Sequence, residues 1–313
     1  MSETILLDGR ATAKAIRGEV AEGVGAFVAD HGRPPGLTVV LVGEDPASSI
    51  YVRNKERAAA KCGMRSDVLR LAKDTPEAEL RATVDRLNAD PNVDGILVQL
   101  PLPKTIDSRR VLDRIAPHKD VDGFHPLNSG ALFSGLEGLF PCTPSGVIEL
   151  LKRYEIPLTG RHAVVLGRSN IVGKPMAMML LAEHCTVTIC HSRTVDLAAH
   201  MRTADIVVAA AGRPGLIRGE HVREGVVVVD VGIHRLTEEA DVREYYGDDP
   251  KRLAALRDKG STLVGDVHPR EVRPKAGAWT PVPGGVGPLT IALLLKNTLV
   301  AAQRTAARGA AAC

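Results

Sequence analysis

The sequence predicts an α/β chain of two domains, each built on a mostly parallel sheet flanked by helices. Its 313 residues exceed the length that one hydrophobic core normally serves. Short apolar runs alternate with helical patterns along almost the whole chain, which is typical of parallel sheets. In the second half, four β-rich runs recur about every twenty residues, as in a doubly wound nucleotide-binding domain.

In the first half, strands are expected at residues 37–43 and within residues 93–103, where apolar side chains follow one another. Between these runs, Asp45 is placed to cap a helix, and Pro46 suits its first position because a proline there sacrifices no hydrogen bond. A second helix is expected over residues 76–88. This order predicts a strand–helix–helix–strand arrangement in the N-terminal half.

In the second half, the expected strands are the runs "HAVVLG", "TVTIC", "ADIVVAAAG" and "GVVVVDVG". Thr143 and Pro144 open a helix near the expected domain boundary. The charged segment 235–260 interrupts the alternation, and we interpret it as a surface excursion rather than a third domain. A last apolar helix is expected over residues 289–303.

Composition and charge exclude several classes of protein. Apolar residues make up 44% of the chain, the net charge is only +3, and aromatic residues amount to 3%, so nothing indicates a nucleic-acid partner. Glu3, Asp8 and Glu19 interrupt the apolar positions of the first twenty residues, which therefore contain neither a signal-peptide core nor a membrane span. We expect a soluble, cytoplasmic protein without a membrane partner.

The cysteines predict free thiols rather than disulfides. Their number is odd and no C-x-x-C pair occurs, which fits a reducing compartment. The five are Cys62, Cys142, Cys185, Cys190 and Cys313. His184 and His191 flank two of them, but the spacing fits no zinc pattern and the run between them is expected to be a buried strand. We expect no metal site.

The turn after the strand "HAVVLG" resembles two phosphate-binding fingerprints without satisfying either. Gly167 and Gly173 are too far apart for a Walker A loop, and Ser169 stands where a dinucleotide fingerprint has its second glycine. A strand, a glycine turn and an apolar helix nevertheless direct backbone N–H groups and a positive helix end toward an anion. Pro175 suits an early helical position. The alternative is a structural strand–helix turn.

The end of the next strand decides which dinucleotide is expected. An NAD enzyme places a carboxylate there against the ribose hydroxyls, whereas an NADP enzyme offers arginine. Here the sequence reads "CHSRT", with Ser192 and Arg193 and no carboxylate, and Arg168 adds a second positive charge. We therefore predict NADP as the cofactor. The alternative for Arg193 is an ordinary solvated arginine.

Candidate substrate residues lie in the first half. Tyr51 and Lys55 are four residues apart on the expected helix and share one face, so a ring could stack a flat substrate while the amine reaches its reactive atom. Gln99 ends an apolar strand, where polar groups tend to face a ligand crevice. The alternatives are a solvated surface pair for the first two, and turn chemistry for Asp120 and Asp122.

Taken together, the motifs resemble the bifunctional methylenetetrahydrofolate dehydrogenase/methenyltetrahydrofolate cyclohydrolase family over residues 6–300. The motifs are "YVRNK", "DGILVQLPLP", "KDVDGFHPLN", "PCTPSGV", "GRSNIVGKP" and "TPVPGGVGPLT". The resemblance implies a folate-binding catalytic domain at residues 1–146, completed by a C-terminal helix at 284–313, and a Rossmann-type NADP domain at 147–283. It further implies a cleft between the domains and a homodimer.

The resemblance assigns roles residue by residue. The substrate-stacking tyrosine falls on Tyr51, the catalytic lysine on Lys55, its glutamine partner on Gln99 and the pterin-binding aspartate on Asp122. Further substrate contacts are implied for Val52, Arg53, Asn54, Val98 and Leu100, and for a loop that closes over substrate, Pro283, Gly284, Gly285, Val286 and Gly287. NADP contacts fall on Gly167, Arg168, Ser169, Ser192 and Ile233. A role for Arg193 rests on the strand-end argument alone.

The implied reactions are NADP-dependent oxidation of 5,10-methylenetetrahydrofolate and hydrolysis of the methenyl product to 10-formyltetrahydrofolate, within the one-carbon metabolism that serves purine biosynthesis. In such a mechanism Lys55 would act as a base toward water, and Gln99 would orient it. Two alternatives stay open: another two-domain NADP dehydrogenase, such as one of the shikimate type, and an inactive nucleotide-sensing relative. The charged segment 235–260 is the main departure from the family pattern.

Overall fold

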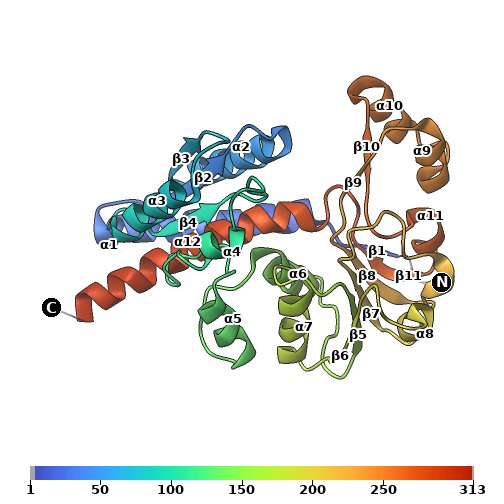
Figure 1. The fold of residues 1–313 in the computed structure, drawn as a ribbon. Helices are drawn as coiled ribbons and strands as arrows, with labels where there is room; N and C mark the ends of the chain where they lie inside the picture. Colours follow the sequence, from blue (N-terminus) through green and yellow to red (C-terminus); the bar gives the residue numbers. More distant parts are fainter. Residues whose placement is uncertain (1–3, 312–313) are drawn as a thin grey trace. The chain divides into compact units, whose positions relative to one another are not determined.

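The structure is a computed structural model that describes residues 4–311, and its chain divides into two compact units (Figure 1). Unit 1 contains the described residues up to Thr12 together with Thr143–Leu289. Unit 2 contains Ala13–Cys142 and the described residues from Thr290 on. Each unit therefore combines segments that are far apart in the sequence.

Unit 2 is built on a three-stranded parallel sheet with the order β3-β2-β4. The strands are β2 (Gly36–Val42), β3 (Arg65–Leu71) and β4 (Gly95–Val98). Both apolar strands predicted in this half are confirmed, but β4 is shorter than its apolar run because Pro101 and Pro103 cannot donate to a sheet. Strand β3 was not predicted, because its sequence "RSDVLRL" is largely polar.

The two helices predicted in the first half of the chain both begin close to the expected residue. Helix α2 (Pro46–Lys61) starts with a proline, and Asp45 Oδ2 accepts a hydrogen bond of 2.7 Å from the Ser48 amide, so the predicted cap is confirmed. The second predicted helix corresponds to α3 (Glu77–Ala89). The unit also contains α4 (Ser108–Leu112), α5 (Pro126–Phe133) and most of α1 (Gly9–His31) and α12 (Val286–Ala311). Of these, α1, α4 and α5 were not predicted.

Both faces of this sheet are covered. Ile96 and Val98 point toward the core that contains Leu80 and Val84 of α3. Gly95 lies on the opposite face, where a Cβ atom would come within 3.2 Å of the Thr298 hydroxyl on α12. Helix α12 extends the predicted last helix at both ends and is long and apolar enough to cross a membrane, yet 56% of its apolar window is buried within the protein. We therefore describe α12 as a core helix.

Unit 1 is a six-stranded parallel sheet with the order β1-β11-β8-β7-β5-β6. The strands are β1 (Ile5–Leu6), β5 (His162–Leu166), β6 (Thr186–Cys190), β7 (Ile206–Ala209), β8 (Val226–Asp230) and β11 (Ala276–Trp279). All four strands predicted in this half are confirmed. Because β5 lies between β6 and β7, the chain reverses its direction of winding at β5, which is the ligand-binding position in doubly wound folds.

The helices of unit 1 follow its strands. They are α6 (Cys142–Arg153), α7 (Gly173–Ala182), α8 (Leu197–Arg202), the 3₁₀ turn η1 (Gly219–His221) and α11 (Pro269–Val272). Alternate residues of β5, β7 and β8 pack with Met201 of α8 and Val272 of α11 in one core. The predicted doubly wound architecture therefore describes this unit.

The N-terminal segment belongs to unit 1, unlike the predicted division at residues 146/147. Ile5 of β1 pairs with Ala278 of β11, and the Leu7 amide donates a hydrogen bond of 2.8 Å to Trp279 O. These backbone bonds tie the first strand to the second half of the chain. Strand β11 was not predicted, because "AGAW" is too short and too rich in small residues to indicate a strand. The structure also places the C-terminal division at Leu289 rather than at residue 283.

The charged segment is folded. It forms β9 (His234–Leu236), α9 (Glu239–Tyr246), α10 (Pro250–Lys259) and β10 (Thr262–Val264), which we call the α9–α10 insertion. Strands β9 and β10 pair antiparallel, and Figure 1 shows α9 and α10 beyond their ends. Leu236, Val242 and Val264 form its small core. The expected surface excursion is therefore an ordered extension of unit 1.

Candidate functional site

Helix α2 and strand β4 place two predicted residues in direct contact. Lys55 Nζ donates a hydrogen bond of 3.0 Å to Gln99 Oε1, and the lysine is only 7% exposed. Tyr51 lies one turn earlier on α2 and is 40% exposed. A buried amine beside an accessible aromatic ring is unlike the solvated surface pair that was the alternative for these residues. The contact supports a ligand site on this face of α2.

The orientation of the Gln99 amide is set by its surroundings. Its backbone N–H donates to Val40 O at 2.9 Å and so extends the β2–β4 pairing by one residue. Its Nε2 donates to Leu100 O at 2.6 Å, which leaves Oε1 to accept from Lys55. The glutamine therefore holds the lysine amine in one place at the carboxyl end of the sheet.

Asp122 is a half-buried carboxyl group near the same amine. Burial is the largest influence and raises its pKa from 3.8 to about 6, while the charge of Lys55 lowers it and that of Asp120 raises it. The influence of Lys55 on its titration shows that the two groups belong to one electrostatic site. Near neutral pH the carboxylate form of Asp122 therefore lies within electrostatic range of the Lys55 amine.

Asp120, for which turn chemistry was the alternative, and residues that the sequence did not reveal hold the Asp122 loop. Asp120 is buried, and its Oδ2 accepts from the His125 amide at 2.8 Å and from Asn128 Nδ2 at 2.9 Å. Asn297 of α12 donates to Val121 O at 2.9 Å. An asparagine inside the apolar run "LLLKNTLV" was the available signal, because a buried amide needs partners. These contacts fix the loop from both sides.

Cys142 also supports this loop. Its Sγ donates to Val121 O at 3.2 Å, and the Asn297 amide lies 3.6 Å from the same sulfur. Burial raises the pKa of the Cys142 thiol well above its usual value of 9.0, and the charge of Asp122 acts in the same direction. The thiol therefore stays protonated and acts as a packing group rather than a nucleophile.

Other predicted substrate residues differ in exposure. The side chains of Val52 and Val98 are buried and belong to the core of unit 2. Arg53 and Asn54 are exposed, and Leu100 is half-buried. Only the last three present side-chain atoms to a ligand in solution. The difference between Val52 and its neighbours Arg53 and Asn54 follows from the helix, because successive residues on α2 point in different directions.

The predicted substrate loop Pro283–Gly287 belongs to unit 1. Gly284 has a φ of +114°, and the Gly285 amide donates to Pro281 O at 2.8 Å. The backbone of Gly9 approaches this loop so closely that a Cβ at that position would lie 1.6 Å from Gly285 O. The glycines are therefore required by the backbone path of the loop.

The glycine turn after β5 has the features of a phosphate-binding turn. Gly167 has a φ of +138°, and a Cβ there would lie 2.2 Å from Ala210 O. Ser169 Oγ accepts from the amides of Val172 at 3.1 Å and Gly173 at 3.2 Å, which shapes the start of α7. Arg168 and Ser169 are exposed. The turn thus presents a positive charge beside a helix N-terminus.

The remaining predicted cofactor residues lie at the same edge of the sheet. Leu166 pairs with Cys190, and the Gly167 amide donates to Cys190 O at 2.8 Å, so the turns after β5 and β6 are adjacent. Ser192 and Arg193 in the turn after β6 are exposed, and no residue within 4–311 pairs with the Arg193 guanidinium. Ile233, beyond the end of β8, is 51% exposed. The parallel strands therefore gather these residues along one edge.

Two buried carboxyl groups brace this edge. Asp266 accepts backbone hydrogen bonds from Ala211 at 2.6 Å, Gly212 at 2.9 Å and Arg213 at 2.9 Å, and its Oδ1 lies 2.7 Å from His234 Nε2. Asp230 accepts from the amides of Gly232, Asp266 and Val267. Burial raises the Asp230 pKa from 3.8 to about 7, despite these hydrogen bonds.

The sequence analysis did not identify these two aspartates. Asp230 is the last residue of the apolar strand in "VVVVDVG", and Asp266 comes two residues after the apolar strand in "TLVGDV". Their backbone partners lie in the turn after β7 and in the segment that carries Ile233. Since Gly232 has no side chain, Asp266 fits against its backbone; a Cβ there would lie 2.4 Å from the carboxylate. The pair therefore shapes the expected cofactor edge.

Within residues 4–311, no group of three or more His, Cys, Asp and Glu residues could hold a metal ion. Cys62, Cys142, Cys185 and Cys190 are free and buried, and Cys313 lies outside the described residues. The Cys185 thiol donates to Leu158 O at 3.2 Å, which uses it for packing.

Comparisons with known proteins cover both halves of the chain. Residues 7–122 match the catalytic domain of the tetrahydrofolate dehydrogenase/cyclohydrolase family, and residues 141–306 match its NAD(P)-binding domain. Bifunctional protein FolD of Moorella thermoacetica is 54% identical over 299 residues, which cover 96% of this chain and 99% of that protein. Bifunctional protein FolD 3 of Rhizorhabdus wittichii is 55% identical over 306 residues, with 98% and 95% covered.

Solved structures show the same similarity. The bifunctional FolD enzyme of Campylobacter jejuni has a TM-score of 0.87 and 47% identity, covering 96% of this chain and 99% of its own. The methylenetetrahydrofolate dehydrogenase-cyclohydrolase of Trypanosoma brucei, complexed with NADP cofactor and inhibitor, has a TM-score of 0.88 and 41% identity, covering 98% and 99%. The similarity therefore extends over both units.

Proposed function

Because the chain belongs to the tetrahydrofolate dehydrogenase/cyclohydrolase family, we propose that Lys55, Gln99 and Asp122 form the centre at which its folate substrate reacts. The protein is a bifunctional enzyme of one-carbon metabolism. It oxidises 5,10-methylenetetrahydrofolate with NADP and hydrolyses the methenyl product to 10-formyltetrahydrofolate. The hydrogen bond of 3.0 Å between Lys55 and Gln99, next to the Asp122 carboxyl group, is the observation that carries the assignment of these residues.

The dehydrogenase reaction requires the residues of unit 1 to hold NADP, which accepts a hydride from the methylene carbon when it is bound. The turn after β5 suits a pyrophosphate, because the exposed Arg168 and Ser169 lie beside the positive N-terminal end of α7. Arg193 and Arg168 offer positive charge for a 2′-phosphate. The exposed side chain of Ile233 provides an apolar contact.

In the cyclohydrolase reaction, Lys55 acts as the base. A water oxygen bonds to the methenyl carbon, and its proton passes to the neutral amine of Lys55. The hydroxyl group on that carbon then loses its proton and becomes the formyl C=O, while the bond from the carbon to N5 breaks with its electron pair staying on N5. N5 takes up one proton in exchange for the one that the hydroxyl loses, so that only the proton passed to Lys55 is released overall. Gln99 Oε1 keeps that amine in position.

Asp122 and Tyr51 bind the substrate. As a carboxylate, Asp122 accepts two N–H groups from the pterin in bidentate fashion. The exposed ring of Tyr51, one turn from Lys55, stacks on a planar part of the folate. In this arrangement the aspartate and the tyrosine set the position of the reacting carbon relative to the amine.

We further propose a homodimer. Strand β6 forms one edge of the six-stranded sheet, so its outer backbone groups have no neighbouring strand within the described chain. Exposed apolar side chains lie on and near that edge, at Ile189, Leu181 and Val195. A second copy that pairs along β6 would cover them. Sedimentation equilibrium of the intact protein tests this proposal, since a monomer at micromolar concentration would contradict it.

We also propose a cytoplasmic protein that supplies formyl groups for purine biosynthesis and binds neither nucleic acid nor a membrane. Four buried free thiols fit a reducing compartment, and a net charge of +3 gives no strong attraction for polyanions. Cell fractionation tests the location. Recovery of the protein in the membrane fraction would contradict it.

A coupled assay tests the function itself. Methylenetetrahydrofolate and NADP are supplied, and the methenyl and formyl products are followed together. Both products should form in sequence. A protein that binds NADP but yields neither product would instead be a nucleotide-sensing relative, and oxidation of shikimate in place of folate would indicate the other alternative.

A further inference from the structure

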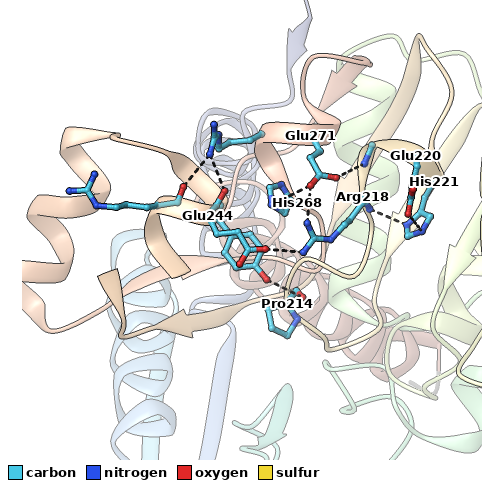
Figure 2. A network of polar contacts seen from close by, with 11 residues as sticks. Pro214, Arg218, Glu220, His221, Glu244, His268 and Glu271 are labelled. Carbon is cyan, nitrogen blue, oxygen red and sulfur yellow. Dashed lines mark hydrogen bonds and ion pairs between the residues drawn. The ribbon is translucent and has the colours of Figure 1, made fainter. Parts of the chain in front are cut away.

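The α9–α10 insertion is attached to the rest of unit 1 through charged contacts on α9. Arg218, in the loop before η1, forms ion pairs with Glu244 of α9 at 2.9 Å and with Glu271 of α11 at 2.8 Å (Figure 2). The two guanidinium nitrogens of one arginine therefore connect the insertion to α11. Because α11 belongs to the core of unit 1 through Val272, this link fixes α9 to a well-packed part of the structure.

Aromatic and backbone contacts reinforce the same attachment. Tyr245 of α9 packs against His268, with ring centroids 5.0 Å apart, and His268 is only 3% exposed. The Tyr245 hydroxyl donates to Pro214 O at 3.5 Å. Arg270 Nη1 donates to Glu244 O at 3.3 Å, near the end of α9. Ion pairs, ring packing and helix-end bonds thus act together to hold α9 in place.

Helix α10 carries Arg252 from the insertion into the body of unit 1. The guanidinium lies 4.1 Å from the centre of the Tyr246 ring, which orients it. Its Nη1 donates to Leu263 O at 3.0 Å, and its Nη2 donates to Val282 O at 2.5 Å. One planar side chain therefore bridges β10 of the insertion and a residue outside the insertion.

Val282 directly precedes the Pro283–Gly287 loop. The hydrogen bond from Arg252 thus holds the residue directly before the loop. The middle of the loop is constrained by the close approach of Gly9 and by the hydrogen bond from the Gly285 amide to Pro281 O. A cavity beside Arg252 has a volume of only about 20 Å³, enough for one water molecule. The guanidinium is therefore placed to hold the backbone.

We propose that Arg252 is a positioning residue for folate binding. Through this side chain, the α9–α10 insertion holds Val282, the residue directly before the Pro283–Gly287 loop, in place. This inference rests on the proposed function and on the substrate contact that the family resemblance implies for that loop. Loss of the charged bond should loosen the loop without altering the groups that react.

The test compares Arg252→Met with Arg257→Met in the full chain. Arg257 lies on the same helix and is exposed, so its variant controls for the loss of positive charge from α10. In Arg252→Met, the KM for methylenetetrahydrofolate should rise about tenfold, whereas the KM for NADP and kcat at saturating folate should change less than twofold. Arg257→Met should match the wild type in all three.

A second pair of variants separates positioning from general destabilisation. Arg252→Lys keeps the charge over the Tyr246 ring but cannot bridge Leu263 O and Val282 O together, so it should raise the folate KM nearly as much. Arg218→Met weakens the α9 attachment and should raise the same KM by a smaller factor. An unchanged folate KM in Arg252→Lys, or equal changes in both KM values for Arg252→Met, would overturn the proposal.

Amide hydrogen exchange distinguishes failure of this inference from failure of the proposed function. Peptides that cover residues 280–287 should exchange faster in Arg252→Met than in Arg257→Met, with no substrate present. If the wild type lacks folate activity but shows this difference, the contact holds the loop and the proposed function is wrong. If exchange is the same in both variants while the wild type is active, Arg252 does not hold the loop.

Discussion

The amine of Lys55 lies 3.0 Å from the amide oxygen of Gln99, although 44 residues separate them in the sequence. The lysine comes from the middle of α2 and the glutamine from the end of β4. Because Gln99 Nε2 is held by Leu100 O, the amide presents a fixed acceptor to the amine. In this pair, the Lys55 amine acts on the substrate, whereas the Gln99 amide holds the amine in position.

Replacement of Gln99 should therefore weaken hydrolysis through the position of Lys55. In Gln99→Leu, the cyclohydrolase kcat is expected to fall about tenfold, because the hydrogen bond from Lys55 to Gln99 Oε1 no longer restrains the amine. The Kd for NADP should not change. Gln303→Leu, at an exposed position of α12, is the control. A kcat equal to that of the wild type would remove Gln99 from the mechanism.

Folate binding should depend on pH, because Asp122 titrates near neutral pH. Its pKa of about 6 means that the carboxylate needed to accept the pterin N–H groups is lost as the pH falls through 6. The folate KM of the wild type should therefore rise between pH 7 and pH 5. Asp122→Asn should show a high KM at both pH values. A wild-type KM that is constant over this range would contradict the proposed role.

The same group has the opposite effect on stability. Because the folded-state pKa of about 6 exceeds the ordinary value of 3.8, Asp122 stabilises the folded protein below that ordinary value, and the stabilisation is lost as the pH rises through 6. The Tm of Asp122→Asn minus the Tm of the wild type should therefore be larger at pH 8 than at pH 4, as measured by thermal unfolding. A difference that does not depend on pH would show that the carboxyl group is solvated.

Arg193 should select NADP over NAD. Its exposed guanidinium lies at the end of β6, next to the glycine turn, so loss of a charged hydrogen bond to the 2′-phosphate should raise the KM for NADP about tenfold or more. The KM for NAD should change little in Arg193→Met. Arg202→Met, an exposed change on α8, controls for net charge. A wild-type enzyme that prefers NAD would refute this interpretation.

Gly167 should tolerate no side chain. In Gly167→Ala, the new Cβ would lie 2.2 Å from Ala210 O, so the turn after β5 must move away from β7. We expect a destabilisation of about 2 kcal/mol or more and weaker NADP binding, measured by chemical denaturation and titration. Gly160→Ala is the control, because Gly160 also has a positive φ but nothing lies within 4 Å of the added atom. Equal effects of the two changes would contradict the close-contact explanation.

Local signals in the sequence were sufficient for much of the fold and the site. The Asp45 cap and the four strands from β5 to β8 follow from residue spacing and from apolar runs. The pairing of Lys55 with Gln99 was implied by the resemblance to a family. The resemblance to a family added their roles. These features depend on residues close together in the sequence or on the general rule that parallel strands present their carboxyl ends at one edge.

Features that depend on distant pairs were not predictable in the same way. Strand β1 joins β11 across more than 270 residues, so the N-terminal segment belongs to unit 1. Asn297 reaches the Asp122 loop from α12, and Asp266 collects backbone amides from the turn after β7. No short motif marks such partners, because buried polar groups are satisfied by whichever backbone the fold brings near them. The bond from Arg252 to Val282 is of the same kind.

The coupled assay of Lys55→Met determines whether the Lys55 amine is the base for hydrolysis. With methylenetetrahydrofolate and NADP, the variant should bind NADP as the wild type does and form formyl product at least about 100-fold more slowly, since positioned bases contribute factors of this size. Lys61→Met, an exposed change near the end of the same helix, should behave as the wild type. Formyl product at close to the wild-type rate in Lys55→Met would contradict the account.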